Sequence, residues 1–303
     1  MRSSKTNNNV DSPEMTNVSW AELLAEVQQH LTLAAVDGDP RVEARWLIEE
    51  ATGATGTEFH DVLSESATVR GVAHLDDMMG RRCSGEPIQY VLGHWAFRYL
   101  DLFVDRRVLI PRPETEVVVD HALRELNRLR PEGRGSVVDL GTGSGAIGLS
   151  VAKERPGTTV VLTERSADAV AVARANLAGL GISGGSVEIF EGSWFEPLPE
   201  RFFGGFDVVV ANPPYVRADA ELAPSVADWE PSEALISGSD GLDDLREIVA
   251  GASPWLRPTG ALVLEMDPTQ SRDVVELAAT FGFEAEVHAD LAGVDRIVVA
   301  RRR

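Results

Sequence analysis

Residues 19 to about 90 carry apolar side chains at helical spacing, which predicts helices with one apolar face each. The first apolar stripe consists of Trp20, Leu23, Leu24, Val27 and Leu31. Ser19 and Glu22 stand at the spacing of a capping box, so the first helix is expected to begin after Ser19. Asp39 followed by Pro40 predicts the start of a second helix. This part of the chain is therefore expected to form a small helical domain.

The pattern then changes to short β-type runs at 100–104 and 107–110, which end at Pro111-Arg112-Pro113 and indicate a hairpin-like connector. From Glu114 onward, apolar strand-like runs alternate with amphipathic helical segments. The runs expected to be strands are 136–140, 159–164, 187–192, 206–211, 261–266 and 295–302. Such alternation predicts an α/β fold with a mostly parallel, doubly wound sheet.

These changes of pattern predict four segments: 1–17, 18–92, 93–113 and 114–303. The first is polar and is expected to be a disordered leader. The second is the helical domain, the third a β-hairpin linker, and the fourth the α/β domain.

Composition narrows the classes of protein to which the chain could belong. Its net charge is −20, whereas nucleic-acid binding usually requires a basic surface, so no nucleic-acid partner is expected. A single cysteine, Cys83, excludes an internal disulfide and fits a reducing compartment. The sequence has neither a signal-peptide core nor the roughly 18 to 20 apolar residues of a membrane span. We therefore expect a cytoplasmic protein with no membrane partner, and no metal site.

A glycine-rich loop, Gly141-Thr142-Gly143-Ser144-Gly145, lies between a predicted strand and a predicted helix. Glycines there allow a sharp turn and close approach of the backbone to a ligand. Glu164 ends the next strand, where a carboxylate can accept hydrogen bonds from ribose hydroxyls. The loop indicates a nucleoside cofactor but does not identify it, because Gly141, Gly143 and Ala146 also satisfy a dinucleotide-binding pattern. A methyltransferase, a nicotinamide or flavin enzyme and a structural turn all remain open at this point.

Asn212-Pro213-Pro214-Tyr215 directly follows an apolar strand and favours one of these alternatives. Ligands of open α/β sheets bind at the carboxyl ends of strands, so this segment is expected beside the glycine loop. Two prolines stiffen it and remove two N–H donors, which leaves the Asn212 side-chain oxygen and the Pro213 carbonyl as acceptors. These acceptors suit a planar NH2 group that receives a methyl group, and Tyr215 offers a flat face.

Together with other segments, these motifs resemble the release factor glutamine methyltransferase family (PrmC/HemK) over nearly all of residues 19–303. The further matching segments are 85–93 (GEPIQYVLG), 108–116 (VLIPRPETE), 229–242 (WEPSEALISGSDGL), 262–266 (LVLEM) and 290–302 (DLAGVDRIVVARR). The resemblance implies a helical N-terminal substrate-recognition domain, a β-hairpin linker and a class I, Rossmann-like S-adenosylmethionine-dependent domain. It also implies methylation of the glutamine of the Gly-Gly-Gln motif in class I peptide chain release factors, and hence a role in translation termination.

By the same resemblance, Gly141 to Gly145 would hold the methionine part of S-adenosylmethionine, Glu164 its ribose and Trp194 its adenine. Asn212 would contact both cofactor and substrate, and Pro213, Pro214 and Tyr215 would bind the glutamine. Arg112 and Glu114 would lie near the entrance of the site.

The chain departs from the family pattern at Glu164, Ser193 and Asp267, where relatives often carry Asp, an acidic residue and Gly. Two related activities share the same site chemistry: methylation of a ribosomal-protein glutamine and of a nucleic-acid adenine. The charge of −20 argues against the second. An intact 212–215 segment argues against a non-catalytic cofactor-binding protein and against an oxidoreductase.

Overall fold

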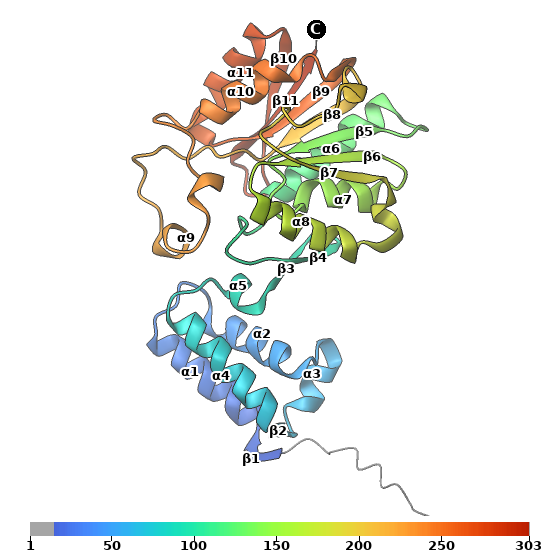
Figure 1. Cartoon of the computed structure of the whole chain (residues 1–303). Helices are drawn as coiled ribbons and strands as arrows, with labels where there is room; N and C mark the ends of the chain where they lie inside the picture. The colour runs from blue at the N-terminus through green and yellow to red at the C-terminus, as the bar shows by residue number, and fades with distance from the viewer. Residues whose placement is uncertain (1–14, 303) are drawn as a thin grey trace, which may run out of the picture. The chain divides into compact units, whose positions relative to one another are not determined.

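The computed structural model describes residues 15–302, which divide into two compact units after Leu92 (Figure 1). Most of the expected leader, residues 1–14, lies outside the described residues. Its last three residues are not a leader but part of strand β1 (Met15–Ser19), which pairs antiparallel with β2 (Ser66–Thr68). This pairing joins segments far apart in sequence, so local composition did not indicate it.

The first unit is helical, as the apolar spacing predicted. Its helices are α1 (Trp20–Leu33), α2 (Pro40–Thr52), α3 (Gly56–Val62), α4 (Val69–Cys83) and α5 (Ile88–Leu92). The capping box is present: Ser19 Oγ accepts from the Glu22 amide at 3.3 Å, and the Glu22 carboxylate accepts from the Ser19 amide at 2.9 Å. Trp20, Val27 and Leu31 are buried in the core of this unit.

The second unit is built on a seven-stranded sheet with the order β10-β11-β9-β8-β5-β6-β7 (Figure 1). Its strands are β5 (Ser136–Leu140), β6 (Thr159–Glu164), β7 (Val187–Glu191), β8 (Phe206–Ala211), β9 (Leu256–Glu265), β10 (Phe283–Ala289) and β11 (Asp295–Arg302). Strands β5 to β9 pair in parallel, whereas β11 pairs antiparallel with both β9 and β10. The predicted α/β fold with a mostly parallel, doubly wound sheet is confirmed.

Helices cover both faces of this sheet (Figure 1). They are α6 (Thr115–Leu129), α7 (Ala146–Glu154), α8 (Ala167–Gly179), α10 (Asp243–Ala252) and α11 (Ser271–Thr280). The short helix α9 (Pro224–Ala227) has no buried residue and lies apart from the sheet (Figure 1). Residues of α10 and α11 share one apolar cluster with side chains from β5, β8, β9 and β11. None of the helices in the described residues is long and apolar enough to cross a membrane.

The hairpin lies earlier in the chain than the sequence predicted. It consists of β3 (His94–Phe97) and β4 (Leu100–Phe103), while the expected strand at 107–110 is absent. The chain turns there, since the Val108 amide donates to the Asp105 carbonyl. The Ile110 amide then donates to the Glu230 carboxylate at 3.2 Å rather than to a neighbouring strand.

Strand β10 was missing from the sequence prediction. Its alternating sequence leaves Phe283 buried while most of the other side chains stay partly or fully exposed, as expected of a strand at the edge of a sheet. A strand with so little apolar content is recognised only once its partner, β11, is known.

Candidate active site

The order of the strands creates a switch point between β5 and β8. From β5 the chain proceeds outward through β6 and β7, then returns to place β8 on the other side of β5. Open α/β sheets bind ligands where the strand order reverses in this way. Leu140 pairs with Ala211 on one side and Thr163 on the other, so the glycine loop, Glu164 and Asn212 come together at one end of the sheet.

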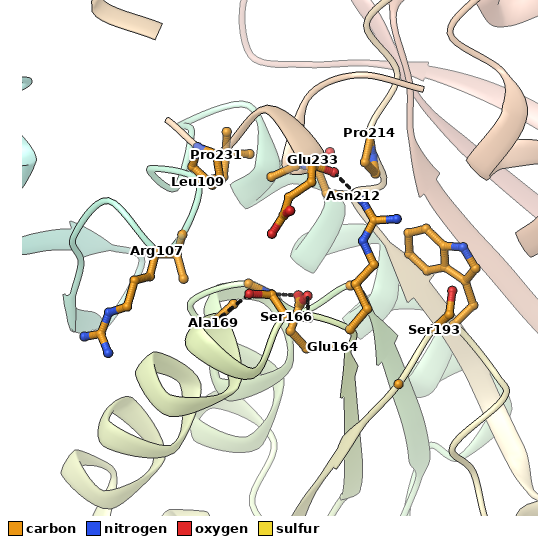
Figure 2. Close-up of a pocket in the computed structure, with 17 residues that line it drawn as sticks. Arg107, Leu109, Glu164, Ser166, Ala169, Ser193, Asn212, Pro214, Pro231 and Glu233 are labelled. Atoms are coloured by element: carbon orange, nitrogen blue, oxygen red, sulfur yellow. Dashed lines mark hydrogen bonds between the residues drawn. The ribbon is translucent and has the colours of Figure 1, made fainter. Parts of the chain in front are cut away.

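A pocket of about 640 Å³, open in part to solvent, lies at this end of the sheet (Figure 2). The predicted site residues that line it are Gly141, Gly143, Glu164, Trp194, Asn212 and Pro214. The pocket also has lining residues that the sequence reading missed: Arg107, Val108, Leu109, Arg165, Ser166, Ala169, Gly192, Pro231, Glu233 and Ala234. The segment 229–242 was matched to the family, but its place in the pocket required the fold.

The glycine loop and Glu164 are held together by direct hydrogen bonds. The Gly143 amide donates to Glu164 Oε2 at 3.0 Å, and the Ser166 amide donates to Oε1 at 3.0 Å. Gly141 and Gly143 have φ values of +65° and +55°, which glycine adopts without strain. A buried carboxylate beside a backbone turn that comes close to the pocket fits a ligand with ribose hydroxyls, as S-adenosylmethionine has.

Trp194 closes one wall of the pocket. Its side chain is buried, and a Cβ atom added to Gly141 would lie 2.8 Å from Cζ3 of the indole ring. The ring therefore packs directly on the glycine backbone, which no larger residue at 141 would permit. Its neighbour Ser193, one of the departures from the family pattern, also lines the pocket.

Three residues of the glycine loop, Thr142, Ser144 and Gly145, stabilise the loop and do not line the pocket. The Thr142 hydroxyl donates to Asp139 at 2.5 Å, and the Ser144 carbonyl accepts from the Asn176 side chain at 2.8 Å. Gly145 has φ of +89° and precedes the first residue of α7.

Asp139, which the sequence reading passed over, lies beneath the loop and is almost fully buried. Its Oδ2 accepts from the Thr142 hydroxyl and from the Gly148 amide at 2.9 Å. Within the described residues Oδ1 has no hydrogen-bond partner. Burial raises the pKa of Asp139 to about 7, and the nearby charge of Glu164 adds to this increase.

We expect Asp139→Asn to keep the fold and to remove part of the pH dependence of stability. The amide oxygen can replace Oδ2 as acceptor for both donors. Because the folded-state pKa lies above the ordinary value of 3.8, the wild type loses stability as the pH rises from about 4 to about 7. Relative to Asp139→Asn, this loss should be at most about 1.4 kcal/mol per pH unit.

Urea unfolding of both proteins across this pH range tests the prediction. Asp139→Ala is the matched comparison, because it also removes the titrating group but leaves both buried donors unpaired, so it should be less stable than Asp139→Asn by about 1–3 kcal/mol throughout this pH range. Parallel stability curves for the wild type and Asp139→Asn would contradict a raised pKa at this position.

The 212–215 segment has its side chains fixed at both ends. Asn212 Nδ2 donates to Thr115 Oγ1 at 3.1 Å, and the Tyr215 hydroxyl donates to Glu265 Oε1 at 3.3 Å. Burial and the charge of Glu265 raise the pKa of Tyr215 well above its ordinary value, so its hydroxyl stays protonated. Pro213 and Tyr215 do not line the pocket, whereas Pro214 and Asn212 do.

The linker motif, residues 108–116, contacts the segment 229–236. Arg112 forms an ion pair of 2.5 Å with Glu230, whose side chain is buried. Glu114 directly precedes α6 and makes no capping hydrogen bond through its side chain. Neither residue lines the pocket, so their predicted place at its entrance remains a prediction.

Comparison with known proteins identifies the family. The chain is 38% identical to the release factor glutamine methyltransferase of Agrobacterium fabrum, over 93% of this chain and 96% of the relative. It is 39% identical to that of Geobacter sulfurreducens, over 86% of this chain and 89% of the relative. The chain belongs to the release factor glutamine methyltransferase family. The family resemblance stated from the sequence is therefore confirmed.

Two family models agree with this membership. Residues 22–93 of this methyltransferase match the model of the PrmC N-terminal domain, and residues 118–228 match that of the Methyltransferase small domain. A solved release factor-specific protein-(glutamine-N5) methyltransferase from Alicyclobacillus acidocaldarius is 28% identical, covering 64% of this chain and 94% of that one with a TM-score of 0.39.

One departure from the family pattern has a structural explanation in this methyltransferase. Asp267 Oδ1 accepts from the Thr269 amide at 2.9 Å and so caps the short helix η4 (Pro268–Gln270). Asp is a favoured residue at such a cap, because its side chain satisfies an otherwise unpaired amide. Asp267 does not line the pocket.

Proposed function

We propose that this enzyme transfers a methyl group from S-adenosylmethionine to the side-chain amide nitrogen (N5) of the glutamine in the Gly-Gly-Gln motif of class I peptide chain release factors. The observation that carries the proposal is the orientation of Asn212. Its Nδ2 is bound to Thr115, so Oδ1 is the atom of this amide that remains to accept a hydrogen bond in the pocket.

The neighbouring prolines extend this acceptor surface. Pro213 and Pro214 have no N–H groups, so the backbone beside Asn212 offers carbonyl acceptors and no competing donors. A glutamine NH2 group has two donors and would be held by Asn212 Oδ1 and the Pro213 carbonyl. Both contacts become stronger as positive charge develops on the nitrogen, which is how fixed dipoles lower the barrier of a reaction.

The cofactor is S-adenosylmethionine, which supplies a methyl group on a sulfonium when bound. The loop 141–145 would hold its methionine part, Glu164 its ribose hydroxyls, and Trp194 would pack near its adenine. Asn212 would contact the cofactor as well as the glutamine. Catalysis by these residues consists of positioning and charge stabilisation. The nitrogen exchanges one N–H proton for the methyl group, and because this proton would pass to water, the scheme requires no dedicated general base.

We further propose that residues 18–92 recognise the release factor, that 93–113 link the domains and that 114–303 carry out the transfer. The compact unit that ends at Leu92 and the family match over 22–93 support these boundaries. Release factors act in the cytoplasm, which is where we place the enzyme.

The test is transfer of labelled methyl groups from S-adenosylmethionine to a purified class I release factor. Parallel reactions contain the factor with Gln of the motif changed to Ala, ribosomal protein and DNA. We expect label on the wild-type factor alone. Label on ribosomal protein or DNA, with none on the factor, would agree with the assigned cofactor but would refute the proposed substrate.

A further inference from the structure

We propose that Gln270 positions the 212–215 segment, whose acceptors hold the substrate amide in the proposed reaction. Gln270 does not line the pocket, so it is a positioning residue and not a catalytic one. The inference rests on the proposed function, because it explains what keeps the substrate-binding segment in place beside the cofactor pocket.

Gln270 is buried where three segments of the second unit meet. It is the last residue of the short helix η4 and is 5% exposed. Its Nε2 donates to the Tyr215 carbonyl at 3.0 Å and to the Gly241 carbonyl at 3.1 Å. Its Oε1 accepts from the Asp267 amide at 3.1 Å. One side chain therefore joins the end of the 212–215 segment to the turn before α10 and to the residues that follow β9.

The neighbours of this amide group allow it one orientation. A glutamine amide donates only from its nitrogen and accepts only at its oxygen. Here the nitrogen faces two backbone carbonyls, and the oxygen faces a backbone N–H. A reversed amide would place oxygen against two acceptors and nitrogen against a donor. The hydrogen bonds from Gln270 to Tyr215 and Gly241 therefore have a fixed direction.

The two carbonyls belong to backbone segments that approach each other closely. Gly241 has a φ of +79°, and a Cβ atom added to it would lie 2.3 Å from the Tyr215 carbonyl oxygen. Buried carbonyl groups need donors, because an unpaired one loses the hydrogen bonds that water would provide. The NH2 group of Gln270 supplies a donor to each carbonyl, so it stabilises the contact between the two segments.

Tyr215 is held both at its backbone and at the end of its side chain. Gln270 binds the carbonyl, and the Tyr215 hydroxyl donates to Glu265 Oε1 at 3.3 Å. Both partners come from the residues that end or follow β9. Strands β8 and β9 are parallel, with Ala211 paired to Leu264, so the 212–215 segment leaves the sheet beside these residues.

The stiffness of the segment connects the position of Tyr215 to the reaction. Asn212 is fixed at the other end by its hydrogen bond to Thr115. The two prolines between Asn212 and Tyr215 restrict the backbone, so a shift of Tyr215 also moves the Pro213 carbonyl. This carbonyl is proposed to accept from the glutamine NH2 group. Loss of the Gln270 hydrogen bonds should therefore misplace the substrate nitrogen relative to the methyl group.

Two substitutions of Gln270 and one matched control test the proposal. Gln270→Met keeps the approximate volume and removes all three hydrogen bonds. Gln270→Glu keeps the length and the acceptor for the Asp267 amide, but it has at most one O–H donor for the two carbonyls. Asp267→Ala is the control, because it removes the other half of the same capping box and retains the Gln270 side chain.

We expect Gln270→Met to lower kcat for methyl transfer about 100-fold and Gln270→Glu about 10-fold, as misplacement of a reacting group does. The KM for the release factor and the Kd for S-adenosylhomocysteine should change little. Asp267→Ala should lose thermal stability but retain kcat. An equal loss of kcat in Asp267→Ala would show that Gln270 acts only as a helix cap and would overturn the proposal. If thermal melting shows that Gln270→Met does not fold, Gln270→Glu decides.

A second readout follows the hydrogen bond itself. The chain has three tyrosines, so tyrosine labelled with carbon-13 at its carbonyl gives three signals, and Tyr215→Phe identifies that of Tyr215. This signal should shift in Gln270→Met but not in Asp267→Ala. An unshifted signal or an unchanged kcat in Gln270→Met would overturn this proposal and leave the proposed function intact. Absence of transfer to the release factor by the wild type would refute the proposed function, and this proposal with it.

Discussion

Replacing Asn212 by alanine is expected to lower kcat/KM for release-factor methylation about 1,000-fold, the upper range for removal of one preorganised polar group from a reaction centre. The substitution removes a side chain that lines the pocket, including the oxygen proposed to accept from the substrate and the nitrogen that donates to Thr115. A backbone carbonyl alone would then hold the substrate amide. Single-turnover transfer of labelled methyl groups measures the effect.

Asn127→Ala serves as the control for this prediction. Asn127 lies on α6 and accepts from Arg155 in an exposed hydrogen bond, so its loss should leave the rate unchanged. Methylation by Asn212→Ala at more than a tenth of the wild-type rate would contradict a central role for this side chain.

Replacing Glu164 by alanine is expected to weaken cofactor binding by about 10- to 100-fold, which corresponds to about 1.5–3 kcal/mol for hydrogen bonds to a charged group. The carboxylate lines the pocket and also accepts from the Gly143 amide, so the substitution should remove the proposed ribose acceptor and loosen the glycine loop. Isothermal titration with S-adenosylhomocysteine measures the change.

Two further variants test whether the loss of affinity is specific to the carboxylate at position 164. Glu164→Asp, which retains a carboxylate at this position, should keep most of the affinity. Glu191→Ala removes an exposed carboxylate from the end of the adjacent strand, outside the pocket, and should bind normally. If Glu164→Ala and the wild type bound S-adenosylhomocysteine with equal affinity, Glu164 would not contribute to cofactor binding.

Much of the site follows from local patterns. The glycine loop and Asn212 each follow an apolar strand and Glu164 ends one, and parallel strands place such residues at one edge of a sheet. The alternation of strands and helices was therefore enough to predict that they come together. The same reasoning did not separate Gly143, which faces the pocket, from Thr142, which points down to Asp139.

The features that the sequence did not reveal depend on contacts between distant segments. The run at 107–110 is apolar enough for a strand, yet the Ile110 amide is bound by Glu230, 120 residues further along the chain. Thr115 and Glu265 have no chemical signature of their own. In the structure Asn212 donates to Thr115 and Tyr215 donates to Glu265, and both contacts join segments that are far apart in the sequence.

The most direct test of the central claim is the position of the transferred methyl group. A class I release factor is incubated with the enzyme and S-adenosylmethionine, digested, and analysed by tandem mass spectrometry. We predict a mass increase of one CH2 unit on the glutamine of the Gly-Gly-Gln peptide, absent when Asn212→Ala replaces the wild type. A methyl group on any other residue, or an unmodified factor after prolonged incubation with active enzyme, would contradict the proposed function.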